Sequence, residues 1–136
     1  MTVSSSTNSP VPGGIFPAGC PSRTVLDHVT SKWGILLLAA LADGPQRWSQ
    51  LRRRAEGISE KMLAQTLKTL EADGFVRRDA WPVIPPRVDY SLTSRGDDVV
   101  AVLKPLVTWI AEHAEEILVD ASAQAILRDQ TPVPVH

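Results

Sequence analysis

Apolar residues recur at helical spacing from residue 21 onward and predict two consecutive helices. In the first, Val25, Leu26 and Val29 fall along one side, and we expect all three to face the core. Residues 32–42 are apolar on most sides, which is typical of a helix at the centre of a core. An Asp-Gly-Pro turn sequence then ends this second helix at residues 43–45.

Two further helices are predicted on either side of a tight turn. The shorter one runs from about residue 49 to 55, and the Glu-Gly pair at 56–57 forms the turn. The longer one covers residues 59–73, because Ser59 is a suitable N-cap and Gly74 can adopt the left-handed conformation that closes a helix. The limits of this helix are therefore well marked in the sequence.

After Gly74 the apolar spacing changes from a helical to an alternating pattern. Residues 75–92 are typical of a β-hairpin whose tip is stiffened by prolines. Thr93 is a suitable N-cap for a last long helix, which carries more apolar residues than one side of a small monomer needs. Pro105 lies inside this helix and removes a backbone hydrogen bond, so we expect a kink there.

The order of these elements predicts the fold class. A mainly α chain with a small β-hairpin, in which a helix pair with a tight turn precedes the hairpin, is typical of a winged helix-turn-helix. We expect a flexible arm rich in Ser, Pro and Gly at residues 1–19, a winged-helix domain at 20–118, and a short C-terminal helix with a flexible tail at 119–136.

Charge is distributed unevenly along the chain. The formal net charge is −1, which by itself argues against a nucleic-acid partner. Residues 44–96, however, hold ten basic against six acidic side chains, whereas the residues from 97 onward hold two basic against seven acidic ones. The helix pair and the hairpin therefore form a basic segment that suits DNA.

The second helix of a helix-turn-helix pair enters the major groove of DNA, where the base edges differ between base pairs. Here that helix is predicted at residues 59–73, and its leucines, Leu63, Leu67 and Leu70, lie opposite its polar face. Arg87, which we expect at the tip of the hairpin, suits phosphate or the minor groove. The candidate DNA-binding residues are Ser59, Lys61, Met62, Gln65, Thr66, Lys68, Arg87, Arg52 and Arg53.

Several short blocks in the same order carry a family resemblance. They are Lys32-Trp33, Arg47-Trp48-Ser49-Gln50-Leu51, Gly57-Ile58-Ser59-Glu60-Lys61-Met62-Leu63, Leu70-Glu71-Ala72-Asp73-Gly74-Phe75-Val76, and Pro85-Pro86-Arg87-Val88-Asp89-Tyr90-Ser91-Leu92-Thr93. Together they resemble the HxlR-type regulators, which are MarR-like winged-helix proteins, over roughly residues 20–113.

The resemblance implies a bacterial, cytoplasmic homodimer that binds a pseudo-palindromic double-stranded DNA operator, most often as a repressor. It also implies that extra helices at both ends of the domain form the dimer, which agrees with the surplus of apolar residues in the last helix. The residues expected at the dimer interface are Val25, Leu26, Val99, Val102, Leu103, Leu106, Trp109 and Ile110.

Cys20 is the single cysteine of the chain and precedes Pro21 at the expected start of the first helix. Unpaired backbone N–H groups and the helix dipole favour a thiolate at such a position. Some relatives that this chain resembles use a cysteine there to sense oxidants or electrophiles, so redox sensing at Cys20 is one hypothesis. The other is that Cys20 is a small packing residue.

The sequence offers little for catalysis or for a cofactor. His28, His113 and His136 are widely spaced, and neither a phosphate-binding glycine loop nor a Gly-x-Ser-x-Gly motif is present. We therefore expect no enzyme, no metal and no cofactor. The alternatives to a DNA-binding regulator are a winged-helix module that binds protein and, with less support, a small thiol enzyme that uses Cys20.

Location and effector are the remaining expectations. No apolar run approaches the roughly 18–20 residues that span a bilayer, and the first residues lack the charged start and apolar middle of a secretory signal. We therefore expect a cytoplasmic protein without a membrane partner. A small-molecule or electrophile effector is a further hypothesis, and its binding residues cannot be named from the sequence.

Overall fold

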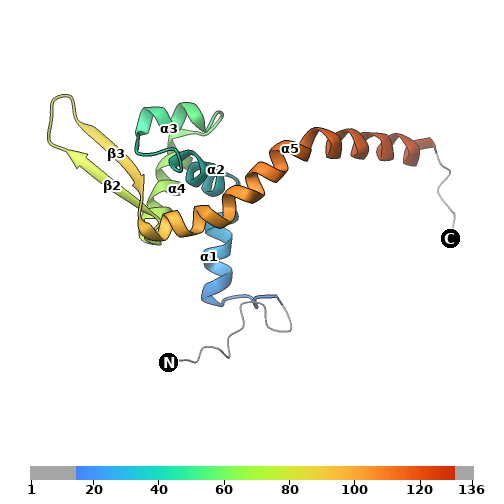
Figure 1. Cartoon of the computed structure of the whole chain (residues 1–136), viewed down its shortest axis with the longest axis horizontal. Helices are drawn as coiled ribbons and strands as arrows, with labels where there is room; N and C mark the ends of the chain where they lie inside the picture. Colours follow the sequence, from blue (N-terminus) through green and yellow to red (C-terminus); the bar gives the residue numbers. More distant parts are fainter. Residues whose placement is uncertain (1–14, 131–136) are drawn as a thin grey trace. The chain divides into compact units, whose positions relative to one another are not determined.

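The computed structural model describes residues 15–130 of the chain. The flexible tail expected at 131–136 and most of the arm expected at 1–19 lie outside the described residues. The chain divides into two compact units, one up to Val100 and the other from Ala101 onward. The first unit holds the helix-turn-helix and the hairpin (Figure 1).

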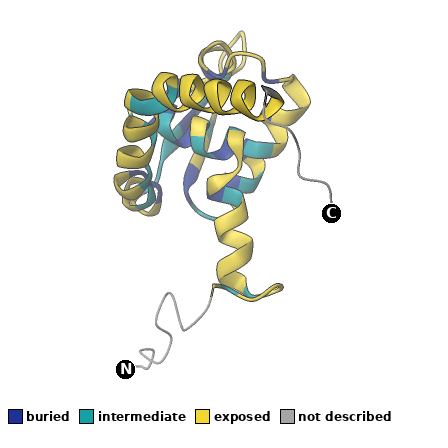
Figure 2. Cartoon of the chain, turned by 90° about the vertical axis from the view of Figure 1, so that its right-hand side faces the viewer, coloured by how far each residue is buried: buried dark blue, intermediate teal, exposed yellow. Residues whose placement is uncertain are grey.

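Helices α1 (Pro21–Thr30) and α2 (Lys32–Leu41) are separated by Ser31, whose hydroxyl accepts a hydrogen bond from the Gly34 N–H at 3.1 Å. Only Val29 of α1 is buried, while Val25 and Leu26 remain about 40% exposed. The expectation that all three face the core is thus wrong for two of them. The cause is that α1 meets the other helices only near its C-terminal end, so its earlier turns extend beyond the core (Figure 2).

Helices α3 (Trp48–Arg54) and α4 (Glu60–Ala72) form the helix pair predicted from the sequence. Gly57 in the connecting turn has φ +92°, a conformation that glycine adopts at little steric cost. The Ser59 hydroxyl accepts a hydrogen bond from the Met62 N–H at 3.0 Å, which confirms the predicted N-cap. Gly74, at φ +81°, follows the end of α4 as predicted.

The hairpin belongs to a three-stranded antiparallel sheet in the order β1-β3-β2. Strands β2 (Val76–Trp81) and β3 (Arg87–Leu92) form the predicted wing. Strand β1 (Gln46–Arg47), which the sequence analysis missed, pairs with β3 so that Gln46 lies opposite Tyr90. Two residues are too few to show an alternating pattern, so β1 exists only because β3 supplies its partner.

The core of the first unit is formed by one face of α4, most of α2 and the inner face of the sheet (Figure 2). Its largest fully buried side chains are Leu37, Leu38, Leu41, Leu51, Leu63, Leu67, Leu70 and Val76. Burying a leucine contributes roughly 1.5–3 kcal/mol relative to leaving it exposed. The three leucines of α4 therefore fix which face of that helix turns outward.

Helix α5 (Ser94–Gln130) begins after Thr93, whose hydroxyl accepts a hydrogen bond from the Gly96 N–H at 3.0 Å. It continues through Pro105 and does not stop at residue 118. The short separate helix expected after that residue is instead the last part of α5. The reason lies in the sequence of residues 119–130, which contains three alanines and neither glycine nor proline.

Candidate nucleic-acid interface

The outward face of α4 carries the polar side chains that the sequence placed there. Lys61, Gln65 and Lys68 are all exposed, and the three leucines at 63, 67 and 70 are buried on the opposite side. The helix therefore presents two ammonium groups and one amide along a single open face. These groups can donate hydrogen bonds to O6 and N7 of guanine, to N7 of adenine and to phosphate oxygens.

One edge of α4 turns toward the junction of α1 and α2. Met62 is 39% exposed and Thr66 is half-buried there, and both line a shallow hollow of about 140 Å³ together with Gln65 and His28. Small-molecule sites usually enclose about 300–1,000 Å³. The hollow is thus too small for a typical ligand, and Met62 and Thr66 lie at the margin of the polar face.

The other edge of α4 faces the sheet across a groove of about 410 Å³. Lys68 lines the groove from α4, and Arg78 lines it from β2, where it pairs opposite Tyr90. The sequence analysis did not select Arg78, although strand alternation places it on the same face as buried Val76. Two cations and the Glu71 carboxylate therefore line a groove between α4 and the sheet.

Arg87 is not at the tip of the wing, as the sequence analysis expected, but is the first residue of β3 and lies opposite Trp81. Its guanidinium is 3.0 Å from a carboxylate oxygen of Asp89 and lies 5.4 Å from the centre of the Trp81 ring. The Trp81 indole N–H also donates to Asp89, at 3.1 Å. This carboxylate reduces the positive charge that Arg87 offers to a phosphate.

The three consecutive arginines of α3 have different surroundings. Arg52 lies 3.3 Å from Glu60 at the start of α4, in a pair in which both side chains are at least half exposed. Arg54 donates to the Ala40 carbonyl at 3.1 Å and to the Asp43 carboxylate at 2.6 Å. Arg53 is exposed and has no ion pair within residues 15–130, so it is the one of the three whose charge stays available.

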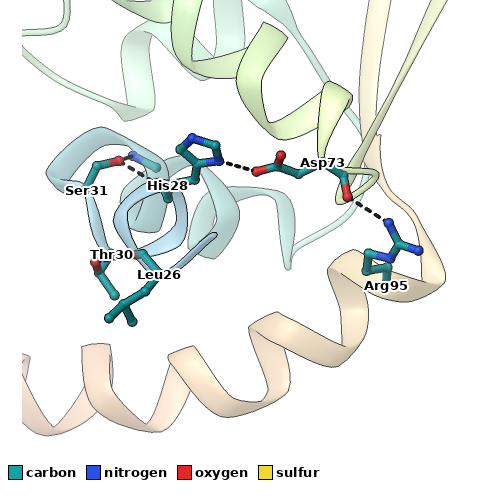
Figure 3. Close-up of polar contacts among 7 residues, drawn as sticks. Leu26, His28, Thr30, Ser31, Asp73 and Arg95 are labelled. Carbon is teal, nitrogen blue, oxygen red and sulfur yellow. Dashed lines mark hydrogen bonds and ion pairs between the residues drawn. The ribbon is translucent and has the colours of Figure 1, made fainter. Parts of the chain in front are cut away.

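The C-terminal end of α4 is held by two other elements, as Figure 3 shows. His28 of α1 is 2.6 Å from an Asp73 carboxylate oxygen, and both side chains are partly buried, at 31% and 19% exposure. Arg95, at the start of α5, donates to the Asp73 carbonyl at 2.9 Å. Asp73 therefore joins α4 to α1 and to the first turn of α5, which fixes the direction of the recognition helix.

Cys20 is the N-cap residue of α1 and is half-buried. Its carbonyl accepts hydrogen bonds from the Arg23 and Thr24 N–H groups, at 3.1 and 3.3 Å. Pro21 occupies the first helical position, as the sequence predicted. The thiol therefore lies at the N-terminal end of α1.

The two described histidines, His28 and His113, have separate partners. His28 is bound to Asp73, and His113 stacks on Trp109 of the same helix with the ring centres 4.2 Å apart. His136 lies outside the described residues. Between residues 15 and 130, no group of three or more His, Cys, Asp or Glu side chains is arranged to hold a metal ion. In the same part of the chain no helix combines the length and hydropathy needed to cross a bilayer.

An open polar face on the second helix of a tight helix pair, next to a three-stranded sheet that projects as a wing, defines a winged helix-turn-helix protein. Residues 28–118 match the family described as HxlR-like helix-turn-helix, and the chain belongs to this family. It is a transcriptional regulator with a helix-turn-helix DNA-binding domain, which confirms the predicted fold class and family.

Named relatives agree with this assignment. The chain is 53% identical over 106 residues to the HTH-type transcriptional regulator YtfH of Escherichia coli (strain K12), covering 78% of this chain and 84% of that protein. The structure of the transcriptional regulator ytfH from Salmonella typhimurium matches with a TM-score of 0.76 at 50% identity, covering 80% of this chain and 97% of that one.

One oxidized and one diamide-treated regulator also have similar structures. The redox regulator HypR in its oxidized form matches with a TM-score of 0.63 at 34% identity, covering 68% of this chain and 96% of that one. Diamide-treated YodB from B. subtilis matches with a TM-score of 0.59 at 32% identity, covering 71% of this chain and 96% of that one.

Proposed function

We propose that this protein is a cytoplasmic homodimer that represses transcription by placing α4 in the major groove of a pseudo-palindromic operator. The observation that carries the proposal is the open face of α4, on which Lys61, Gln65 and Lys68 are exposed. The side chains on this face take no part in the buried core. Their ammonium and amide groups can donate hydrogen bonds to acceptor atoms on base edges and to phosphate oxygens.

The proposed contacts divide into two kinds. Gln65 and Lys61, near the N-terminal half of α4, are assigned to base edges, with Met62 and Thr66 at the margin and Ser59 at the helix start. Lys68 and Arg78 are assigned to the phosphates of the strand that crosses the groove between α4 and the wing. Arg52, Arg53 and Arg87 add backbone contacts, of which Arg53 is the strongest candidate because its charge has no carboxylate partner among the described residues.

The homodimer is supported by exposed apolar side chains at the two ends of the domain. Such side chains are rare in large numbers on a monomer and mark contact surfaces. On α1 they are Val25 and Leu26, and on α5 they include Val102, Leu106, Trp109 and Ile110, each at least 40% exposed. Val99 and Leu103 are half-buried members of the same predicted set.

Binding to a duplex tests the proposal directly. A duplex is first selected by the protein from a randomised library, and its affinity is then measured at several salt concentrations. Gln65→Ala should reduce the preference for the selected duplex over a scrambled one by about 1–3 kcal/mol. Lys68→Ala should weaken binding to both duplexes and reduce the slope of log K against log salt by about one unit.

Lys104→Ala is the matched control, because it removes the same charge from α5 and should leave both quantities unchanged. A wild-type protein that retains no duplex, or whose binding does not respond to salt, would overturn the proposal. That result would favour the alternative of a winged-helix module that binds protein. The thiol-enzyme alternative has no support in a family of transcriptional regulators.

A second proposal concerns control of DNA binding by thiol modification at Cys20, with an oxidant or electrophile as effector. It is supported by the position of Cys20 at the N-terminal end of α1 and by the similarity to HypR and to diamide-treated YodB. Diamide should release the wild-type protein from the selected duplex, while Cys20→Ser should stay bound. Equal release of both proteins would overturn thiol control at Cys20.

A further inference from the structure

The wing ends in an apolar tip. Strands β2 and β3 pair as far as Trp81 and Arg87, and the five residues between them are Pro82, Val83, Ile84 and two further prolines. Ile84 is fully exposed, at 100%, and Val83 is 49% exposed. A fully exposed isoleucine at the end of a projecting hairpin is unfavourable in water, and it gains free energy when a partner covers it.

The charges beside the tip limit what that partner is. The tip itself has no charged residue, and the nearest carboxylates, Asp79 and Asp89, are paired with Arg77 and Arg87 at 3.0 Å. Arg47 has no carboxylate partner in the described chain, and it lines a hollow of about 430 Å³ together with residues 83–86 of the tip and with Arg87 and Val88 of β3. This surface therefore combines a fully exposed apolar side chain, Ile84, with a cation, Arg47.

The minor groove of DNA has the complementary chemistry. Its walls are formed by the apolar faces of the sugars and its rims by phosphates, and proteins that bind it often place apolar side chains such as Ile, Leu or Pro there, in many cases as wedges between base steps. The tip lies on the same unit as the face of α4, and a wing reaches the minor groove next to the major groove that its recognition helix occupies.

We infer that Ile84 enters the minor groove of the operator and contacts its sugars, with Arg47 on the phosphate at the rim. This inference rests on the proposed function and deepens it, because it adds an apolar contact at the wing tip to the backbone contact assigned to Arg87. The three prolines of the tip fix much of its backbone in advance, which lowers the conformational entropy lost on binding.

An apolar contact differs from an ionic one in its response to salt. A cation on a phosphate releases counterions, so its removal changes the slope of log K against log salt, whereas an isoleucine on sugars releases none. The wing therefore contributes affinity that persists at high salt. This property separates Ile84 from Lys68 in one experiment.

The test uses the full-length protein and the duplex that it selects from a randomised library. Ile84→Ser should weaken binding about tenfold at every salt concentration and leave the salt slope unchanged. Ile84→Leu should restore most of the affinity, and Lys68→Ala should lower the slope. Hydroxyl-radical cleavage should show sugars beside the half-site that the wild type protects and Ile84→Ser leaves open.

Three other results would contradict the inference. Wild-type affinity and protection for Ile84→Ser would overturn it while leaving the proposed function intact. A change in oligomeric state of Ile84→Ser, measured by light scattering, would show that the tip contacts a second copy of the chain instead of DNA. If the wild type retains no duplex at all, the proposed function fails, and the inference fails with it.

Discussion

Arg53 and Arg54 are adjacent on α3, yet only one of them holds the fold together. Arg54 reaches back to the end of α2, where it donates to the Ala40 carbonyl and to the Asp43 carboxylate. Arg53 points to solvent and has no ion pair within the described range. The same residue type therefore has a structural task at one position and is left free for a ligand at the next.

Replacing these two arginines by alanine should separate the two tasks. Arg54→Ala removes a bond to a carbonyl at a helix end as well as a half-exposed ion pair, so the free energy of unfolding should fall by about 1 kcal/mol. Arg53→Ala should change it by less than about 0.5 kcal/mol. Urea unfolding of both variants measures the difference, and equal losses would contradict the assigned roles.

For single residues, the sequence predicts which side of a helix is exposed better than it predicts which side chains form ion pairs. The exposure of Lys61, Gln65 and Lys68 follows from helical periodicity, because the buried leucines of α4 fix the opposite face. The pairing of Arg52 with Glu60 crosses from one helix to the next and depends on how the turn between them is folded. The exposure of Val25 and Leu26 depends on how far α1 extends past its neighbours, which no local pattern records.

Among the elements, α4 depends on what holds its C-terminal end. The close contact between His28 and Asp73 is partly buried and joins α1 to α4 across forty-five positions of sequence. Arg95 binds the carbonyl of the same aspartate (Figure 3). The orientation of the recognition helix therefore depends on α1 as well as on its own leucines.

A double-mutant cycle tests this link. His28→Ala and Asp73→Ala should each lower the free energy of unfolding, and the double variant should lose less than the sum, with a coupling energy of about 0.5–1 kcal/mol. Asp27→Ala is the control, because Asp27 is exposed and precedes His28. Its effect should add to that of His28→Ala, and additivity in both cycles would contradict the link.

The sequence predicts long elements closely and short ones poorly. The helix expected at 59–73 forms between Ser59 and Asp73, since its cap, its leucine spacing and its closing glycine all agree. Strand β1 was missed because its two residues have no period of their own. The break expected near residue 118 was wrong because nothing in residues 119–130 opposes a helix.

For the whole molecule, the proposed dimer makes stability depend on concentration. Leu106 is 47% exposed on α5, and Thr108 lies about 200° further around the same helix. Leu106→Glu should shift the protein toward monomer and weaken operator binding, because a charge would be buried in the interface. Thr108→Glu adds the same charge to the other face and should leave the dimer intact.

Sedimentation and thermal unfolding at several protein concentrations measure this difference. The melting temperature of the wild type should rise with concentration, and that of Leu106→Glu should not. A wild-type melting temperature that is independent of concentration, together with a monomeric mass, would contradict the dimer.

The pairing of β1 with β3 also has a consequence for synthesis of the chain on the ribosome. Gln46 cannot pair with Tyr90 until the whole helix pair and most of the wing have left the ribosome. Until then β1 has no strand partner and the core of the first unit is incomplete. The start of α5, up to the buried Val100, must then pack before the first unit is complete. A chain truncated just before β3 should therefore need chaperone protection, whereas one that extends past Val100 should already resist proteolysis.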